Sequence, residues 1–131
     1  MPSTIGLEQK IQVGKEVVLP SDSPTADYSV VFEDDGTTGY LYGVKFHGET
    51  YDIVDALHIY NASSVIDRHK PSTVQILWSE DGLKAALLIN NYPHAVLDFE
   101  SHKGFCRTNF PPPESDWTRD EWSDEALQYF E

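Results

Sequence analysis

The stretch VVFEDDGTTGYLYGV, residues 30–44, places three acids and a glycine between two runs rich in β-forming residues. Apolar residues recur at every second position through residues 28–33 and again through 40–46, which is the period of a half-buried β-strand. Two such runs around a glycine-containing loop predict a β-hairpin. We therefore expect hairpins to be the main unit of the fold.

The acids of this loop, Glu33-Asp34-Asp35, could hold a divalent cation, form a catalytic carboxylate pair or simply turn the chain. Hard cations prefer clustered oxygens, but a calcium loop needs acids at alternate positions and a closing glutamate, and neither is present. Adjacent side chains of a strand also point to opposite faces. We favour a solvated turn, because Asp and Gly are strong turn formers, with Asp34 and Asp35 as weak candidate metal ligands.

The second half of the chain repeats this outline. A further Glu-Asp-Gly turn at residues 80–82 lies between two runs of strand-forming residues, so the same tripeptide is expected to turn the chain twice. The strands predicted outside the first hairpin are 11–19, 73–79, 83–90, 94–101 and a short one at 104–108.

Two segments have helical periodicity. In YDIVDALHIYN, residues 51–61, the apolar residues share one arc of a helical wheel and Asp52, Asp55 and His58 share the other, which predicts a short central helix. Near the end, Thr118 and Glu121 have capping-box spacing, and an apolar stripe follows at Trp122, Ala126, Tyr129 and Phe130. This pattern predicts a C-terminal helix that docks on the sheet, because a helix so short is unstable alone.

These elements predict an α+β fold: a mostly antiparallel sheet built from hairpins, covered on one side by the central and C-terminal helices. Residues 1–131 have the length of a single domain, with residues 1–9 as a flexible N-terminus. Residues 111–117, which begin with three prolines, are expected to form a spacer before the C-terminal helix.

The composition is strongly acidic. Twenty-two acids against nine bases give a net charge of −13, which argues against nucleic acid as a partner and favours solubility and basic protein partners. The single cysteine, Cys106, permits no internal disulfide and fits a reducing compartment. We see no signal peptide, no apolar run long enough to cross a membrane and no cofactor motif, so we expect a cytoplasmic protein.

Catalytic candidates are few. Asp55 and His58 would lie on one face of a helix over residues 51–61, and a carboxylate beside an imidazole is the raw material of general base catalysis. The alternative is the solvent-facing stripe of an amphipathic helix, which we favour. Arg107 could depress the pKa of the neighbouring Cys106, but in a strand the two point to opposite faces, and a buried structural thiol is the preferred interpretation.

Aromatic residues are abundant along the predicted strands, and we expect most of them, Tyr40, Tyr42 and Phe46 included, in the core. Tyr92 and Phe110, which lie nearest to loops, are candidate contact residues instead. Trp117 and Trp122 lie in an acidic tail, residues 111–131, with seven acids against one arginine. They would be exposed binding residues if the C-terminal helix did not dock.

The segments VFEDDGTTGYLYGV, IVDALHIYN, VQILWSEDGLKAALLIN and GFCRTNFPPP together resemble a family of small acidic bacterial proteins classed as a domain of unknown function. The resemblance covers residues 28–113, roughly two thirds of the chain. It implies a bacterial cytosolic protein with a single domain, and it supplies no activity and no catalytic residues.

The sequence therefore favours a non-enzymatic module that binds another protein as an inhibitor, immunity factor or regulator, with a basic protein as the favoured partner. The alternative is a small-ligand-binding or hydrolase-like enzyme with a polar pocket around Asp55 and His58. A third hypothesis is a structural subunit of a homo-oligomer, assembled through a strand edge or the C-terminal helix.

Overall fold

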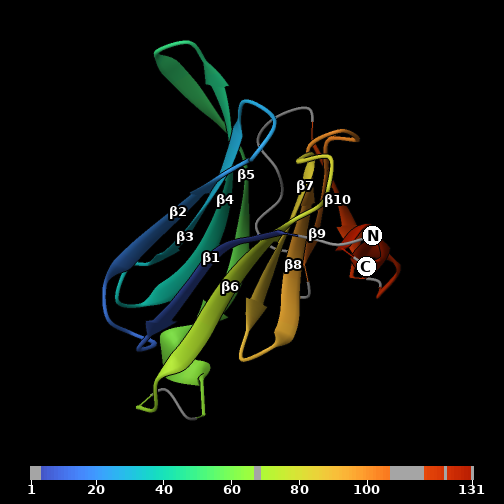
Figure 1. Cartoon of the computed structure of the whole chain (residues 1–131). Helices are drawn as coiled ribbons and strands as arrows, with labels where there is room; N and C mark the ends of the chain where they lie inside the picture. Colours follow the sequence, from blue (N-terminus) through green and yellow to red (C-terminus); the bar gives the residue numbers. More distant parts are fainter. Residues whose placement is uncertain (1–3, 67–68, 107–116, 123, 131) are drawn as a thin grey trace.

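The computed structural model describes residues 4–66, 69–106, 117–122 and 124–130, and it shows two β-sheets packed face to face (Figure 1). The strand order is β2-β3-β4-β5 in one sheet and β1-β6-β7-β8-β9-β10 in the other. The strands are β1 (Thr4–Ile11), β2 (Val17–Asp22), β3 (Tyr28–Asp34), β4 (Thr38–His47), β5 (Thr50–Asn61), β6 (Ser72–Trp78), β7 (Lys84–Ile89), β8 (Tyr92–Asp98), β9 (Lys103–Cys106) and β10 (Thr118–Glu121). Two 3-10 helices, η1 (Ala62–Ser64) and η2 (Asp124–Phe130), complete the described elements.

Hairpins dominate the connections. Neighbouring strands pair antiparallel throughout, except that β10 runs parallel to β9. The predicted hairpin is confirmed: β3 pairs with β4 across the turn that contains Gly36, whose φ of 97° suits glycine. The predicted hairpin around residues 80–82 is confirmed as well, since β6 pairs with β7.

The hydrophobic core lies between the two sheets. Phe32 and Leu41 enter it from the four-stranded sheet, and Ile76, Trp78 and Leu97 enter it from the six-stranded sheet, all with at most 1% of their surface exposed. Burying a side chain of this size contributes about 1.5–3 kcal/mol. This layer of side chains, rather than the turns, holds the two sheets together.

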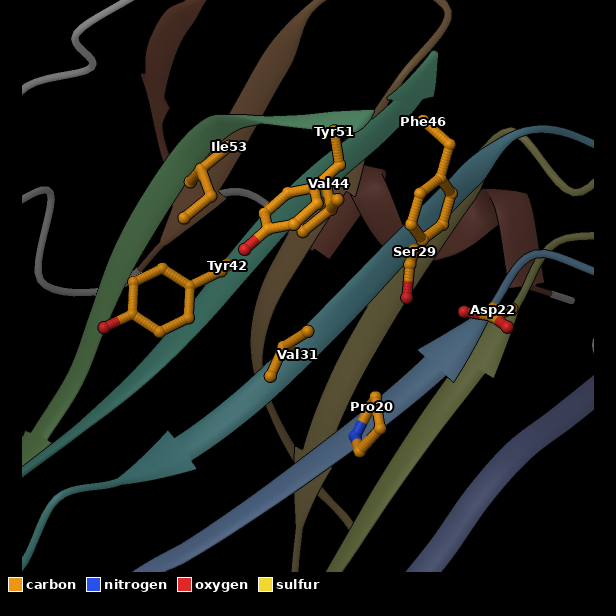
Figure 2. Close-up of a pocket in the computed structure, with 9 residues that line it drawn as sticks. All are labelled: Pro20, Asp22, Ser29, Val31, Tyr42, Val44, Phe46, Tyr51 and Ile53. Atoms are coloured by element: carbon orange, nitrogen blue, oxygen red, sulfur yellow. The ribbon is translucent and has the colours of Figure 1, made fainter. Parts of the chain in front are cut away.

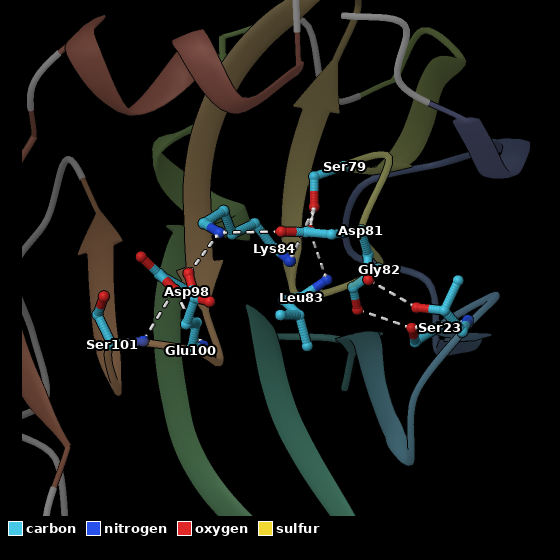
Figure 3. Close-up of polar contacts among 10 residues, drawn as sticks. Ser23, Ser79, Asp81, Gly82, Leu83, Lys84, Asp98, Glu100 and Ser101 are labelled. Carbon is cyan, nitrogen blue, oxygen red and sulfur yellow. Dashed lines mark hydrogen bonds and ion pairs between the residues drawn. The ribbon is translucent and has the colours of Figure 1, made fainter.

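Polar contacts join the two sheets at one end of the sandwich (Figure 3). The Ser23 hydroxyl donates to the carbonyl oxygen of Gly82 at 2.7 Å, and the Thr25 hydroxyl donates to that of Asp81 at 2.6 Å. Inside, the Trp78 indole donates to the Ser21 hydroxyl at 3.0 Å. The loop after β2 is therefore fastened to the turn between β6 and β7.

The C-terminal segment covers the outer face of the six-stranded sheet. Ala126 is buried against Ala86 and Val96, and Trp122 and Phe130 pack around them. In Figure 1 this segment lies outside the sheet, beside β10. Within the described residues, no helix is long and apolar enough to span a membrane.

The predicted α+β class is wrong, because the chain is nearly all β. The predicted central helix, residues 51–61, is the strand β5. The pairing of β5 with β4 skips Val54 and Ile59, so the strand bulges at both residues. Each bulge shifts the alternation of side chains by one position, and the shifted pattern imitates the periodicity of a helix.

The predicted C-terminal helix is corrected as well. Residues 118–121 form β10 along the edge of β9, and a single seven-residue 3-10 helix, η2, follows in place of the predicted α-helix. The boundaries of the first two strands also differ from the prediction. Residues 4–9 belong to strand β1, and the predicted strand 11–19 is split by a turn at Gly14 between β1 and β2.

Candidate functional site

The outer face of the four-stranded sheet is apolar and exposed. We call it the open face and define it by the outward-pointing residues Val18, Pro20, Val31, Tyr40, Tyr42, Val44, Phe46, Tyr51 and Ile53. Tyr51 is 62% exposed, Val18 57%, Ile53 56% and Phe46 37%. No described element packs over it, in contrast to the outer face of the six-stranded sheet. Contiguous apolar surface of this kind marks interaction sites.

A hollow of about 310 Å³ lies in the middle of the open face. Figure 2 shows its lining side chains projecting from all four strands toward the same side. Pro20, Val31 and Val44 lie along its base, and Tyr42, Tyr51 and Phe46 stand around it. The lining is predominantly apolar, as in most ligand and anchor pockets of proteins.

The aromatic side of the hollow is built by the β4–β5 hairpin. The last residue of β4 that pairs with β3 is Lys45, so the pairs Phe46–Tyr51 and His47–Thr50 extend beyond the rest of the sheet. The hairpin tip projects past the other strands in Figure 1. His47 Nε2 and Asp52 Oδ2 lie 2.8 Å apart, and this contact joins the two strands of the extension.

Two acids lie at the margins of the open face. Asp22 ends β2 opposite Ser29, and Glu33 lies on β3 between Val18 and Tyr40. The Tyr42 hydroxyl donates to Glu33 Oε1 at 3.1 Å. Burial, together with this carboxylate, raises the pKa of Tyr42 to about 12, so its hydroxyl stays protonated and remains a hydrogen-bond donor at neutral pH.

The Glu-Asp-Asp acids of the first hairpin have three different environments. Glu33 points to the open face, whereas Asp34 is 1% exposed. The Asp34 carboxylate accepts hydrogen bonds from the amides of Gly14 (2.7 Å) and Gly36 (2.8 Å) and from the Tyr60 hydroxyl (2.6 Å). Asp35 accepts from the amides of Thr38 and Thr37, which lower its pKa.

Asp34 and Asp35 therefore do not converge on a common point, because each carboxylate is held by its own set of donors. Among the described residues, no group of three histidines, cysteines or acids is arranged to hold a metal ion.

The catalytic candidates of β5 are separated by the sheet. Asp55 pairs with Gly43 and is buried, and its Oδ1 accepts from the amide of Ala56. His58 points to the opposite face, where its ring lies 5.6 Å from that of Tyr40 and its Nε2 lies 3.0 Å from Asn61 Oδ1. Arg107 lies outside the described residues. Asp55 and His58 thus project from opposite faces of β5 and do not converge on one site.

The predicted contact residues lie apart from the open face. Tyr92, at the start of β8, is 53% exposed and packs edge-on against His94. Trp117 is buried against Phe99 and His102, and Trp122 packs on the outer face of the six-stranded sheet. Phe110 lies outside the described residues.

The open face was missed because its aromatic row was assigned to the core. Tyr40 and Tyr42 point outward, and the residue between them, Leu41, is the one with no exposed surface. The available signal is Gly43, between Tyr42 and Val44. It lacks a side chain where the strand meets Leu97 and Phe99 of the other sheet, which marks its side of β4 as the inner one.

These features define a two-sheet β-sandwich in which the C-terminal segment covers one outer face, whereas the described residues leave the other open. The chain belongs to a family of uncharacterized proteins conserved in bacteria (DUF2251), which it matches over residues 11–131; the resemblance predicted from the sequence is thereby confirmed. It is 45% identical over 118 residues to an uncharacterized protein of Haemophilus influenzae, a match that covers 88% of this chain and 73% of the relative. No solved structure matches it.

Proposed function

We propose that this protein is a non-enzymatic, cytoplasmic binding module that engages another protein, as an inhibitor, immunity factor or regulator, through the open face. The observation that carries the proposal is the exposure of Tyr51, Ile53, Val18 and Phe46 on one sheet face. The chain covers the corresponding face of its other sheet with its own C-terminal segment.

A protein surface fits this face better than a small molecule. The hollow is open to solvent, and Val18 and Tyr40 continue the apolar surface beyond it. Its polar lining consists of Asp22, Ser29 and the hydroxyls of Tyr42 and Tyr51, which is little to orient a reacting group. Tyrosine is also enriched among the residues that dominate protein interfaces, because it combines a large apolar area with a hydroxyl group.

The test is capture of the cellular partner by the purified tagged protein, followed by titration of the purified partner. The double variant Tyr51→Ser/Ile53→Ser removes two exposed side chains of the face and should weaken binding at least tenfold. Tyr92→Ser removes an equally exposed aromatic residue elsewhere and should leave the affinity unchanged. Both variants should retain the circular dichroism spectrum and melting temperature of the parent.

A partner that binds the double variant as tightly as the parent would overturn the proposal. So would light scattering that showed a dimer lost on Tyr51→Ser/Ile53→Ser, because the face would then be occupied by a second copy of the chain. A homo-oligomer is the alternative function that uses the same surface.

A further inference from the structure

We infer that the open face selects a partner segment in which an apolar anchor is flanked by lysine or arginine on both sides. The inference rests on the proposed function, and it adds the chemistry of the partner. It follows from where the acids lie around the hollow and from the absence of lysine and arginine on the open face, across strands β2–β5 that are described in full.

The hollow provides the place for the anchor. Val31 and Val44 lie at its base, with Phe46 and Tyr51 at one side. A volume of about 310 Å³ is enough for a large apolar side chain and part of a neighbouring one. An anchor there would cover Tyr51 and Ile53, which are 62% and 56% exposed.

The two acids lie on either side of that anchor position. Ser29 and Glu33 are four residues apart on β3, and Asp22 is the partner of Ser29 on β2. At about 3.3 Å per residue, the two carboxylates are offset by about 13 Å along the strands, with Val31 midway. A matching pair of cations would be about four residues apart on an extended segment, or about nine on an α-helix.

The open face carries no lysine or arginine on strands β2–β5, and its histidine, His58, lies beside Tyr40. Lys45 is the one lysine or arginine in strands β2–β5, all of whose residues are described. It lies between Val44 and Phe46 on β4, so its side chain points to the opposite face of the sheet. Asp52, its partner on β5, points the same way and pairs with His47. The face is therefore acidic locally, and not only through the charge of −13 on the whole chain.

Glu33 is also oriented. The hydroxyl of Tyr42 holds its Oε1 at 3.1 Å, so the carboxylate is fixed at the edge of the apolar surface before a partner arrives. A positioned charge beside a surface that loses water on binding discriminates between partners more strongly than a freely moving one. Complementary charges of this kind also accelerate encounter, and the acceleration is lost as salt is added.

The experiment compares two fluorescent helix-forming peptides of equal length and equal leucine content, one with lysine and one with glutamate at the polar positions. Affinity is measured by fluorescence anisotropy at low and at moderate salt. We expect the lysine peptide to bind at least tenfold more tightly, and its advantage to fall about tenfold in Asp22→Asn/Glu33→Gln. The control Glu8→Gln/Glu80→Gln makes the same charge change at two exposed residues away from the face, on β1 and in the β6–β7 turn, and should lower the affinity less than twofold.

Equal losses in the two double variants would overturn the inference, because attraction would then come from the overall charge. Equal affinity for the two peptides, or binding of neither, would overturn it as well. The proposed function has a separate criterion: it fails if Tyr51→Ser/Ile53→Ser leaves the affinity for both the peptides and the cellular partner unchanged.

Discussion

The hydroxyl of Tyr60, on β5, donates a 2.6 Å hydrogen bond to the buried carboxylate of Asp34, on β3. The same carboxylate accepts from the amides of Gly14 and Gly36, in two different turns. One acid therefore joins two strands and two turns at one end of the four-stranded sheet. Burial, with the hydrogen bond to Asp34, raises the pKa of Tyr60 above its usual range, so this donor is retained at any moderate pH.

Tyr60→Phe should destabilise the protein by about 1.5–3 kcal/mol, because it removes a hydrogen bond to a buried charged group. The measurement is the free energy of unfolding in urea at neutral pH. Tyr40→Phe is the matched control on the neighbouring strand, since its hydroxyl makes no hydrogen bond to any described residue. Equal stability of the two variants would show that Tyr60 contributes only its ring to the structure.

The turn at these acids was predictable from the sequence, but the different environments of Glu33, Asp34 and Asp35 were not. Alternation indicated that neighbouring carboxylates point apart, and Glu33 and Asp34 do so. Two of the donors to Asp34 are distant in the sequence: Gly14 is 20 residues away and Tyr60 is 26 residues away. Such partners are set by the pairing of β2 and β5 with their neighbours, which composition and periodicity do not specify.

The contacts of Ser23 and Thr25 with the turn between β6 and β7 supply a second prediction. Gly82 has a φ of 71°, and a Cβ there would collide with the Thr25 hydroxyl that bonds the same turn. Gly48 has a φ of 66° with open space around it. Gly48→Ala should therefore cost about 1–2 kcal/mol from backbone strain alone, and Gly82→Ala about 1–3 kcal/mol more from the collision.

Thermal or urea unfolding of the two alanine variants gives this difference directly. If Gly82→Ala cost no more than Gly48→Ala, the loop after β2 would have to detach from the turn readily, and the contacts of Ser23 and Thr25 would hold the sheets together only weakly. The double variant Thr25→Ser/Gly82→Ala checks the cause, because removal of the Thr25 methyl group leaves the clashing hydroxyl in place and should restore little stability.

A third prediction concerns pH and the turn shown in Figure 3. Hydrogen bonds from the Ser79 hydroxyl and the Leu83 amide, with the charge of Lys84, lower the pKa of Asp81 against a smaller opposing effect of burial. A folded-state pKa below the unfolded one means that the charge of Asp81 stabilises the fold above the usual pKa, and that this contribution is lost as the pH falls through the folded value.

Asp81→Asn should thus be less stable than the parent at pH 7, by less than about 1 kcal/mol because the side chain is half exposed. The difference should vanish in strong acid. Glu80→Gln removes the same charge from the neighbouring exposed residue and corrects for the general relief of repulsion in an acidic chain. A gap between the two variants that persisted unchanged in acid would exclude the charge as its cause.

The fold was only partly predictable for a local reason. Strands with regular alternation, such as β3, β4 and β6, were recognised from their sequence. Strand β5 was not, because bulges at Val54 and Ile59 break its alternation. Nor did the sequence indicate that residues 118–121 would complete a sheet edge, since their polar pattern matches a helix start as well as a strand.

The candidate site was hidden by a different ambiguity. In a two-sheet sandwich, the row that alternates inward and the row that alternates outward differ only by one residue of register. The larger side chains, Tyr40 and Tyr42, predict a core position for their own row. The core instead contains Leu41 and Gly43, and Leu97 and Phe99 of the other sheet fill the space opposite Gly43. Packing against the second sheet decides this choice, and it is visible only once both sheets are in place.

The exposed apolar surface itself makes the last prediction. A neutral apolar dye such as Nile red should bind the folded protein and fluoresce, because the hollow offers an apolar surface bounded by Tyr42, Phe46 and Tyr51. Tyr51→Ser/Ile53→Ser should remove most of this signal at unchanged melting temperature, since both side chains are more than half exposed and contribute little to the core. Tyr92→Ser should keep the signal. If the signal survived in Tyr51→Ser/Ile53→Ser and disappeared in Tyr92→Ser, the dye would bind at the start of β8. The open face would then not be the binding site.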